Sequence, residues 1–175
     1  MMAQQKIRII VILTALWGTF GTAYSSATDI TISGTVVASA CVVDAGTREQ
    51  TVKFEQARAV NYTQPGDTSE WQDFALTLSS CPASTTLVTA SLSGNADRDD
   101  PSKFANSQGD ATGMALQIMT RDHLTEIAPM GEISANVDPI NRSAIFPLSA
   151  RMYTPTGSVV AGDFNTTVQL SFTYQ

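Results

Sequence analysis

The C-terminal stretch "NTTVQLSFTYQ", residues 165–175, decides the fold, because its apolar and polar side chains alternate up to the end of the chain. The apolar positions are Val168, Leu170, Phe172 and Tyr174, and polar residues stand between them. A period of two residues is typical of a β-strand with one buried face. Chain ends usually fray and carry little pattern. We therefore expect a half-buried terminal strand with a function of its own.

The first residues have the three-part plan of a secretory signal peptide. Two basic residues, Lys6 and Arg8, precede a short apolar run, and small residues follow. The apolar run is shorter than the about 20 residues that span a bilayer. Cleavage after Ala23 and cleavage after Ala27 both fit the pattern. We expect a signal peptide over residues 1–23, with the second site as the alternative.

Two cysteines, Cys41 and Cys81, remain in the exported chain. In an oxidising compartment such a pair predicts one disulfide. The bond closes a loop of about 40 residues and is worth about 3–4 kcal/mol on the chain-entropy model. Two cysteines and the single histidine, His123, cannot complete a four-ligand structural zinc site.

Length and charge narrow the classes of protein further. The mature chain of about 150 residues suits one domain. The whole chain carries 10 basic and 16 acidic residues, a net charge of −6. An acidic chain argues against a nucleic-acid partner.

Short alternating or β-branched stretches follow one another along the mature chain, separated by turn-rich segments. Such spacing without a helical period predicts an all-β sandwich. A proline inside one stretch, Pro147, predicts an edge strand or a bulge there. The expected strands are residues 30–43, 51–56, 71–80, 86–94, 113–120, 143–153 and the C-terminal stretch.

Several motifs together resemble the pilin subunits that the chaperone–usher pathway assembles. The alternating stretch "ITISG" follows the signal peptide, and Cys41 lies seven residues after Gly34. Cys81 ends the stretch "LTLSSC". Gly162 is the fourteenth residue from the C-terminus and Tyr174 is the penultimate one. The resemblance covers the whole mature chain and is greatest to the minor adaptor pilins at the tip of type 1 pili.

The resemblance implies an all-β fold, an incomplete immunoglobulin-like sandwich that lacks its seventh strand and is completed by a donor strand. It implies a donor-strand extension over residues 24–38 and a pilin domain over residues 39–175. The C-terminal strand then borders the open groove and pairs with a periplasmic chaperone, which anchors the terminal carboxylate. The residues expected in this role are Gly162, Val168, Leu170, Phe172, Tyr174 and Gln175.

The expected donor face of the extension is Ile30, Ile32, Gly34 and Val36, with polar residues on the opposite face. A slip of one residue would turn the polar set toward the groove, so the face is well specified. Burying the two isoleucines and the valine at about 1.5–3 kcal/mol each gives roughly 5–9 kcal/mol. Thr28 stands where the shaft pilins carry a further glycine, as in adaptor-like relatives.

The implied function is structural: a minor or adaptor subunit of an adhesive cell-surface fimbria, exported through the periplasm and polymerised by donor-strand exchange. Its expected partners are other pilin subunits, the periplasmic chaperone and the outer-membrane usher. We expect no nucleic-acid partner, no stable membrane insertion after signal removal, no cofactor, no metal and no enzymatic activity. His123 has no nucleophile motif around it, and the acidic run 96–103 lacks the EF-hand pattern.

Two alternatives remain open at this level. In the first, the chain is a secreted sugar- or receptor-binding adhesin domain, in which Trp71 and Phe74 form a sugar platform instead of packing in the core. In the second, it is a terminator at the base of the fibre, which the sequence does not distinguish from an adaptor.

Overall fold

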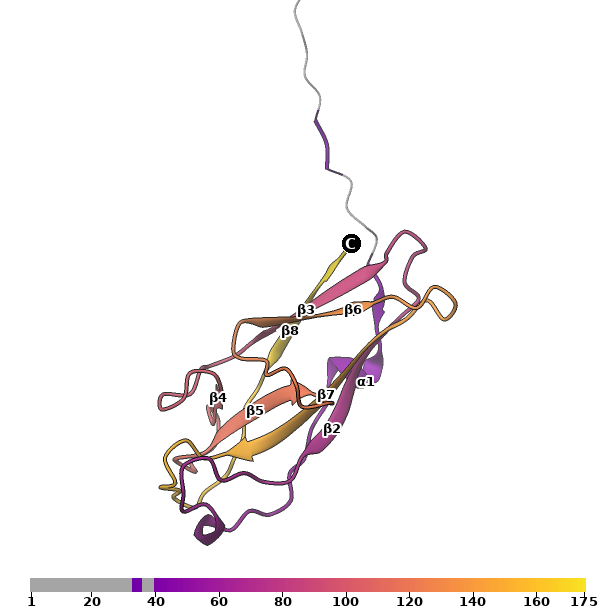
Figure 1. The fold of residues 1–175 in the computed structure, drawn as a ribbon. Helices are drawn as coiled ribbons and strands as arrows, with labels where there is room; N and C mark the ends of the chain where they lie inside the picture. Colours follow the sequence, from indigo (N-terminus) through magenta and orange to yellow (C-terminus); the bar gives the residue numbers. More distant parts are fainter. Residues whose placement is uncertain (1–32, 36–39) are drawn as a thin grey trace, which may run out of the picture. The chain divides into compact units, whose positions relative to one another are not determined.

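The alternating stretches of the sequence form antiparallel strands in the computed structural model, which describes residues 33–35 and 40–175 (Figure 1). These residues contain two sheets, a five-stranded one in the order β1-β2-β7-β5-β4 and a three-stranded one in the order β6-β3-β8. The all-β prediction is confirmed. The bounds are β1 Val42–Val43, α1 Ala45–Arg48, a 3₁₀ helix Ala59–Asn61, β2 Gln72–Ser79, β3 Leu87–Ser93, β4 Phe104–Ala105, β5 Ala115–Thr120, β6 Gly131–Asn136, β7 Ala144–Tyr153 and β8 Gln169–Tyr174.

The chain divides into two units, Met1–Thr35 and Val36–Gln175. Residues 33–35 of the first unit are exposed and have no regular secondary structure. The two sheets belong to the second unit. The predicted signal peptide and most of the predicted donor extension lie outside the described residues.

The core lies between the two sheets and follows from the period of two. In β3 every second residue is buried, and Val88 and Ala90 have no exposed surface. From the other sheet Leu78 and Phe146 contribute side chains with at most 1% exposure. Burying a large apolar side chain stabilises the fold by about 1.5–3 kcal/mol, so this layer holds the sheets together.

The strands predicted over residues 71–80, 86–94, 113–120 and 143–153 and at the C-terminus are confirmed as β2, β3, β5, β7 and β8. The strand predicted over residues 51–56 is wrong, because this stretch belongs to neither sheet. Strand β6 was not predicted from the sequence, because its apolar content is low. Ile133 and Ala135 are half-buried there, and β6 forms because it pairs along β3.

Pro147 does not lie on an edge strand or in a bulge, so that prediction is wrong. Its strand β7 is central, with β2 on one side and β5 on the other, and the register with β2 is continuous. The carbonyl of Pro147 accepts a hydrogen bond from the Arg121 amide, just beyond the end of β5. The pyrrolidine nitrogen faces the same side, where β5 has already ended. The one bond that the proline cannot donate therefore lies at the end of the β5–β7 ladder, and the proline is tolerated.

The predicted disulfide between Cys41 and Cys81 is confirmed. It joins the residue before β1 to the residues after β2, and both cysteines are buried. Beside it, Val42 pairs with Ser79 and Val43 with Leu78. The bond therefore fixes the start of the second unit to the edge of the larger sheet.

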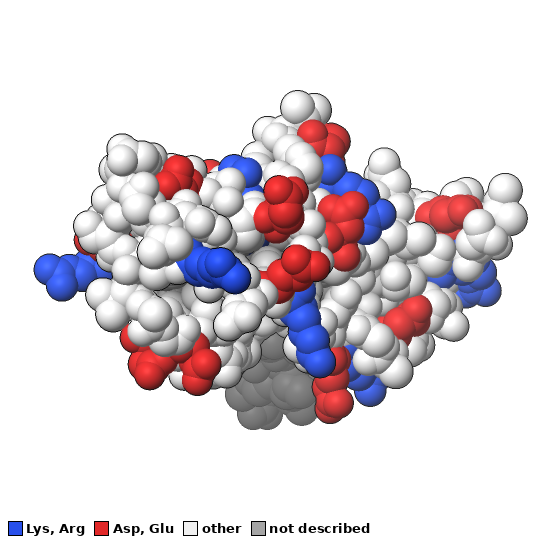
Figure 2. Space-filling model, turned by 90° about the horizontal axis from the view of Figure 1, so that it is seen from below, with Lys and Arg blue, Asp and Glu red and all other residues white. Residues whose placement is uncertain are grey.

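Figure 2 shows how the charged side chains are distributed on one face of the protein. On the face shown in Figure 2, acidic and basic side chains are interspersed. The net charge of −6 is therefore not concentrated in one acidic patch on this face.

Candidate functional site

The C-terminal strand β8 forms the edge of the smaller sheet. It pairs with β3 in antiparallel register from Val88 opposite Tyr174 to Ser93 opposite Gln169. The pairing continues at Gln175, whose amide donates to the Leu87 carbonyl at 2.9 Å. No strand in the described part of the chain lies on the other side of β8.

The backbone of β8 has unpaired groups on that free side. Because Gln175 faces β3, the residues that face away from β3 alternate with it. Each has one N–H and one C=O, so four residues leave eight hydrogen-bonding groups without a strand partner. A row of this kind is a template for pairing with another chain. The four residues are Val168, Leu170, Phe172 and Tyr174.

The side chains of the same four residues point toward the core but are only half-buried. The ring of Phe172 lies 6.1 Å from the ring of Phe146, centroid to centroid. Burial raises the pKa of the Tyr174 phenol above its usual value of 10.0. These residues belong to the apolar layer, yet each keeps a part of its surface uncovered.

A groove with a volume of about 800 Å³, the β8 groove, is lined by three of the four, Val168, Leu170 and Phe172. Its floor includes Phe74 and Leu76 from β2. One wall is formed by Val168, Leu170 and Phe172. The opposite wall begins with Val43, Thr47 and residues 49–51, and smaller hollows continue between residues 50–57 and 161–168.

Residues 50–57 form the far wall of the β8 groove. They belong to no sheet, and the backbone hydrogen bonds among the described residues include none from this segment. Val52 and Phe54 are nevertheless half-buried, and the residues beside them are exposed. The Phe54 ring packs edge-on against Phe164 at 6.1 Å. The segment thus has the alternation of a strand without a strand partner.

The remaining predicted site residues are Gly162, Gln175 and those of the extension. Gly162 precedes β8, and a Cβ there would lie 2.5 Å from the Ala111 nitrogen, so the position has no room for a side chain. Gln175 is exposed, and its carbonyl oxygen accepts from the amides of Thr86 and Leu87. Gly34 is exposed, and a Cβ added there would meet no atom within 4 Å. Ile30, Ile32 and Val36 lie outside the described residues.

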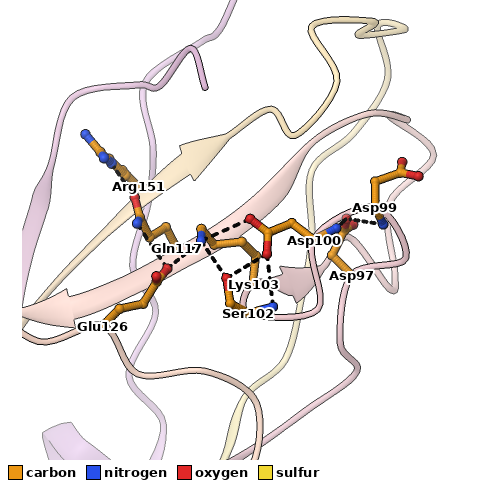
Figure 3. Close-up of polar contacts among 8 residues, drawn as sticks. All are labelled: Asp97, Asp99, Asp100, Ser102, Lys103, Gln117, Glu126 and Arg151. Carbon is orange, nitrogen blue, oxygen red and sulfur yellow. Dashed lines mark hydrogen bonds and ion pairs between the residues drawn. The ribbon is translucent and has the colours of Figure 1, made fainter. Parts of the chain in front are cut away.

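The acidic run 96–103 uses its carboxylates within the protein (Figure 3). Asp97 accepts hydrogen bonds from the amides of Asp99 and Asp100. The buried Lys103 ammonium lies 3.2 Å from Asp100 and 2.7 Å from Glu126. Within residues 33–35 and 40–175, no three acidic, histidine or cysteine side chains are arranged to hold a metal ion.

Local hydrogen bonds shift the pKa values of Asp100 and Lys103. Burial acts to raise the pKa of the Asp100 carboxyl, but hydrogen bonds from Ser102 and Lys103 outweigh it and lower that pKa below 3.8. The pKa of Lys103 is correspondingly raised above 10.5, because burial acts to lower it but its bonds to Glu126 and Asp100 outweigh that effect. Through Lys103, the cluster joins the loop that contains Asp100 to the loop that contains Glu126.

Trp71, considered above as part of a sugar platform, makes its ring contacts within the protein. The His123 ring stacks on it at 4.2 Å with an angle of 16° between the planes. The Arg151 guanidinium carbon lies 4.1 Å from the Trp71 ring centroid. Phe74, the other residue considered, packs against the core and lines the β8 groove.

The far wall and the hydrogen bonds of the Thr47 side chain to Thr77 were not predicted from the sequence. The signal for the wall was present, because residues 51–56 alternate as a strand does. Alternation alone, however, does not tell whether the neighbouring strand comes from the same chain. Thr47 gave no signal, because its role depends on the distant residue Thr77.

Comparison with known proteins identifies the family. A family model described as fimbrial protein matches residues 30–175. The chain belongs to the fimbrial protein family. This pilin is 33% identical over 147 residues to the fimbrial-like protein YdeR of Escherichia coli K12, covering 83% of this chain and 84% of that protein. It is 32% identical over 145 residues to protein FimG of the same strain, covering 83% of each.

Solved structures support the same fold. The P pilus rod subunit PapA superposes with a TM-score of 0.65 at 15% identity, covering 77% of this pilin and 99% of that chain. A subunit of a chaperone-usher pilus superposes with a TM-score of 0.63 at 16% identity, covering 89% and 99%. The chain is therefore a fimbrial subunit with an immunoglobulin-like fold. Other pilin subunits are the partners that this family implies, and the cell-surface fimbrium is its place.

Helices contribute little to the described part of this pilin. Neither α1 nor any other helix within residues 33–35 and 40–175 has the length and apolar character needed to cross a lipid bilayer.

Proposed function

We propose that this pilin is polymerised by donor-strand exchange, with the β8 groove as the acceptor and its own residues 24–38 as the donor. After export and removal of residues 1–23, a periplasmic chaperone fills the groove first. At the outer-membrane usher, the extension of another subunit replaces the chaperone. The subunit then takes part in cell adhesion as a component of the fibre.

One observation supports the acceptor role above all others. The four residues that turn unpaired backbone groups away from β3 are those whose apolar side chains are left half-covered. One inserted strand can therefore pair with the free backbone groups and also cover the exposed apolar surface. Its backbone pairs with β8, and its alternate side chains enter the groove. This is β-strand addition, in which backbone hydrogen bonds supply affinity and side-chain pockets supply specificity.

The far wall supports the same proposal from the other side. Residues 50–57 carry the alternation of a strand but have no strand partner among the described residues. A strand in the β8 groove lies between them and β8. Hydrogen bonds on both sides at about 1 kcal/mol net each then add to the burial of its apolar face. The ordering of the incoming segment lowers this gain.

We propose a minor or adaptor position in the fibre. This rests on Thr28, which stands where the shaft pilins carry a further glycine. A minor subunit is incorporated in few copies, so immunogold counts along single fibres test this position.

Peptide binding tests the donor-strand proposal. A synthetic peptide of residues 28–38 is mixed with the mature pilin and with pilins co-expressed with it. We expect a complex that resists denaturant with at least one of these acceptors. The double substitution Ile30→Asp and Ile32→Asp abolishes it, because the two charges would enter an apolar groove.

The matched control places the same charges on the opposite face of the peptide, as Thr31→Asp and Ser33→Asp. We expect this peptide to bind nearly as well as the natural one. Equal binding by the two charged peptides would show that the extension does not insert with the predicted face.

A further inference from the structure

Thr47 is the buried residue of the short helix α1, with 7% of its surface exposed. Its hydroxyl oxygen accepts a hydrogen bond from the Thr77 amide at 2.8 Å. The same hydroxyl donates to the Thr77 carbonyl at 3.2 Å. One side chain thus satisfies both backbone groups of a residue 30 positions away.

The bonded residue lies at the edge of the larger sheet. Thr77 belongs to β2 and turns its backbone away from β7, toward the side on which β1 pairs. β1 ends after Val43, and the Asp44 amide also donates to the Thr77 carbonyl at 3.1 Å. The Thr47 hydroxyl therefore stands in for the next residue pair of the β1–β2 ladder. It closes this edge at the point where the chain leaves the sheet.

The far wall of the β8 groove begins three residues later. Because residues 50–57 form no backbone hydrogen bonds among the described residues, their position depends on the packing of Phe54 and on the fixed points at the two ends of the segment. The far end is held by the 3₁₀ helix and the buried Tyr62. The near end is held by α1, which the Thr47 hydroxyl attaches to β2.

We propose that Thr47 is a positioning residue for strand binding, which acts by holding the far wall at a fixed distance from β8. The inference rests on the proposed function of the groove. With the Thr47 hydroxyl in place, an incoming strand binds a preformed β8 groove. Without the hydroxyl, the far wall becomes ordered only on binding, and the cost of that ordering lowers the affinity.

The first test measures binding of the peptide of residues 28–38 to the mature pilin, by fluorescence anisotropy, with three variants. Thr47→Val keeps the shape but removes both hydrogen bonds, and we expect about tenfold weaker binding. Thr47→Ser keeps the hydroxyl and stays within about twofold of the natural protein. The control is Thr112→Val, because Thr112 is exposed, does not line the groove, and its side chain forms no hydrogen bond among the described residues.

Equal binding by the Thr47→Val and Thr112→Val proteins would overturn the inference and leave the proposed function intact. If the natural pilin does not bind the peptide of residues 28–38, its groove does not accept its own extension, and the second test decides on Thr47. Hydrogen exchange of the pilin without peptide needs no ligand. We expect Thr47→Val to speed amide exchange at Thr77 and to change the amide exchange rates of residues 50–57. The amides of β3 should keep their protection from exchange.

The exchange test has two contrary results. Unchanged exchange at Thr77 and in the far wall would show that the hydroxyl does not hold the wall. Loss of protection throughout β3 would show that Thr47 supports the whole fold and has no specific role at the groove. Recovery of the natural exchange pattern by Thr47→Ser, but not by Thr47→Val, is the result that the inference requires.

Discussion

Phe172→Ala separates the two roles of β8, because the Phe172 ring takes part in the fold and in the groove. The ring packs near Phe146 and lies across from the buried Ala90, yet it is only half-buried. A fully buried phenylalanine costs about 3–5 kcal/mol when cut back to alanine. Because the Phe172 ring is half-buried, we expect Phe172→Ala to lower the free energy of unfolding by about half of that, roughly 2 kcal/mol.

The uncovered half of the ring sets the effect on strand binding. If an inserted strand covers it, Phe172→Ala removes a further 1–2 kcal/mol, approximately, from the binding free energy. That corresponds to about 5- to 30-fold weaker binding of the strand peptide. Urea unfolding at low protein concentration, with the disulfide intact, gives the first quantity, and a peptide titration gives the second.

Thr173→Ala is the matched control, because Thr173 is the next residue of β8 and its exposed side chain lies on the outer face. We expect it to change both quantities by less than about 0.5 kcal/mol. If Thr173→Ala lowers stability and peptide affinity as much as Phe172→Ala does, the assignment of Phe172 to the inner face of β8 and of Thr173 to the outer face would be refuted. A stability loss from Phe172→Ala with unchanged peptide affinity would refute the assignment of the groove.

Three further outcomes follow from local features of the pilin. Cys41→Ser removes the disulfide and lowers the free energy of unfolding by about 3–4 kcal/mol, and reductant then has no additional effect on unfolding in urea. Gly162→Ala places a methyl group 2.5 Å from the Ala111 nitrogen and lowers the unfolding midpoint, whereas Gly46→Ala, with no atom within 4 Å, leaves it nearly unchanged. The pKa of Asp100 is lowered in the folded state, so its contribution is complete above the unfolded value of 3.8 and is lost as pH falls through the folded one. Asp100→Asn therefore flattens the loss of stability below about pH 4, and an unchanged acid limb in a pH series of unfolding curves would contradict this.

The terminal strand and the core strands could be predicted from the sequence because their pattern repeats every two residues. Val168 to Tyr174 alternate without a break, and so do the buried positions of β3. β6 could not be predicted in this way. It owes its place to a partner strand, and "GEISAN" has one strongly apolar residue to signal it.

The groove itself was predictable only through the resemblance to pilins. Alternation shows that residues 51–56 can be a strand, but it does not show where the partner comes from. The strand prediction implied a partner within the chain, and the structure contains none among the described residues. Thr47 lay beyond sequence reasoning for a different reason: its bond to Thr77 joins residues brought together by the turn at α1.

Pro147 has a consequence for the register of the larger sheet. It is tolerated in central β7 because its nitrogen points past the end of β5. If β7 slid by one position along β2, the ring nitrogen would rotate toward β2, where a donor is needed. The misaligned sheet would lose a hydrogen bond inside the β2–β7 ladder, whereas in the correct register the missing donor lies at the end of the β5–β7 ladder. A proline in the middle of this strand therefore favours the correct register. It destabilises the register shifted by one residue more than the correct one.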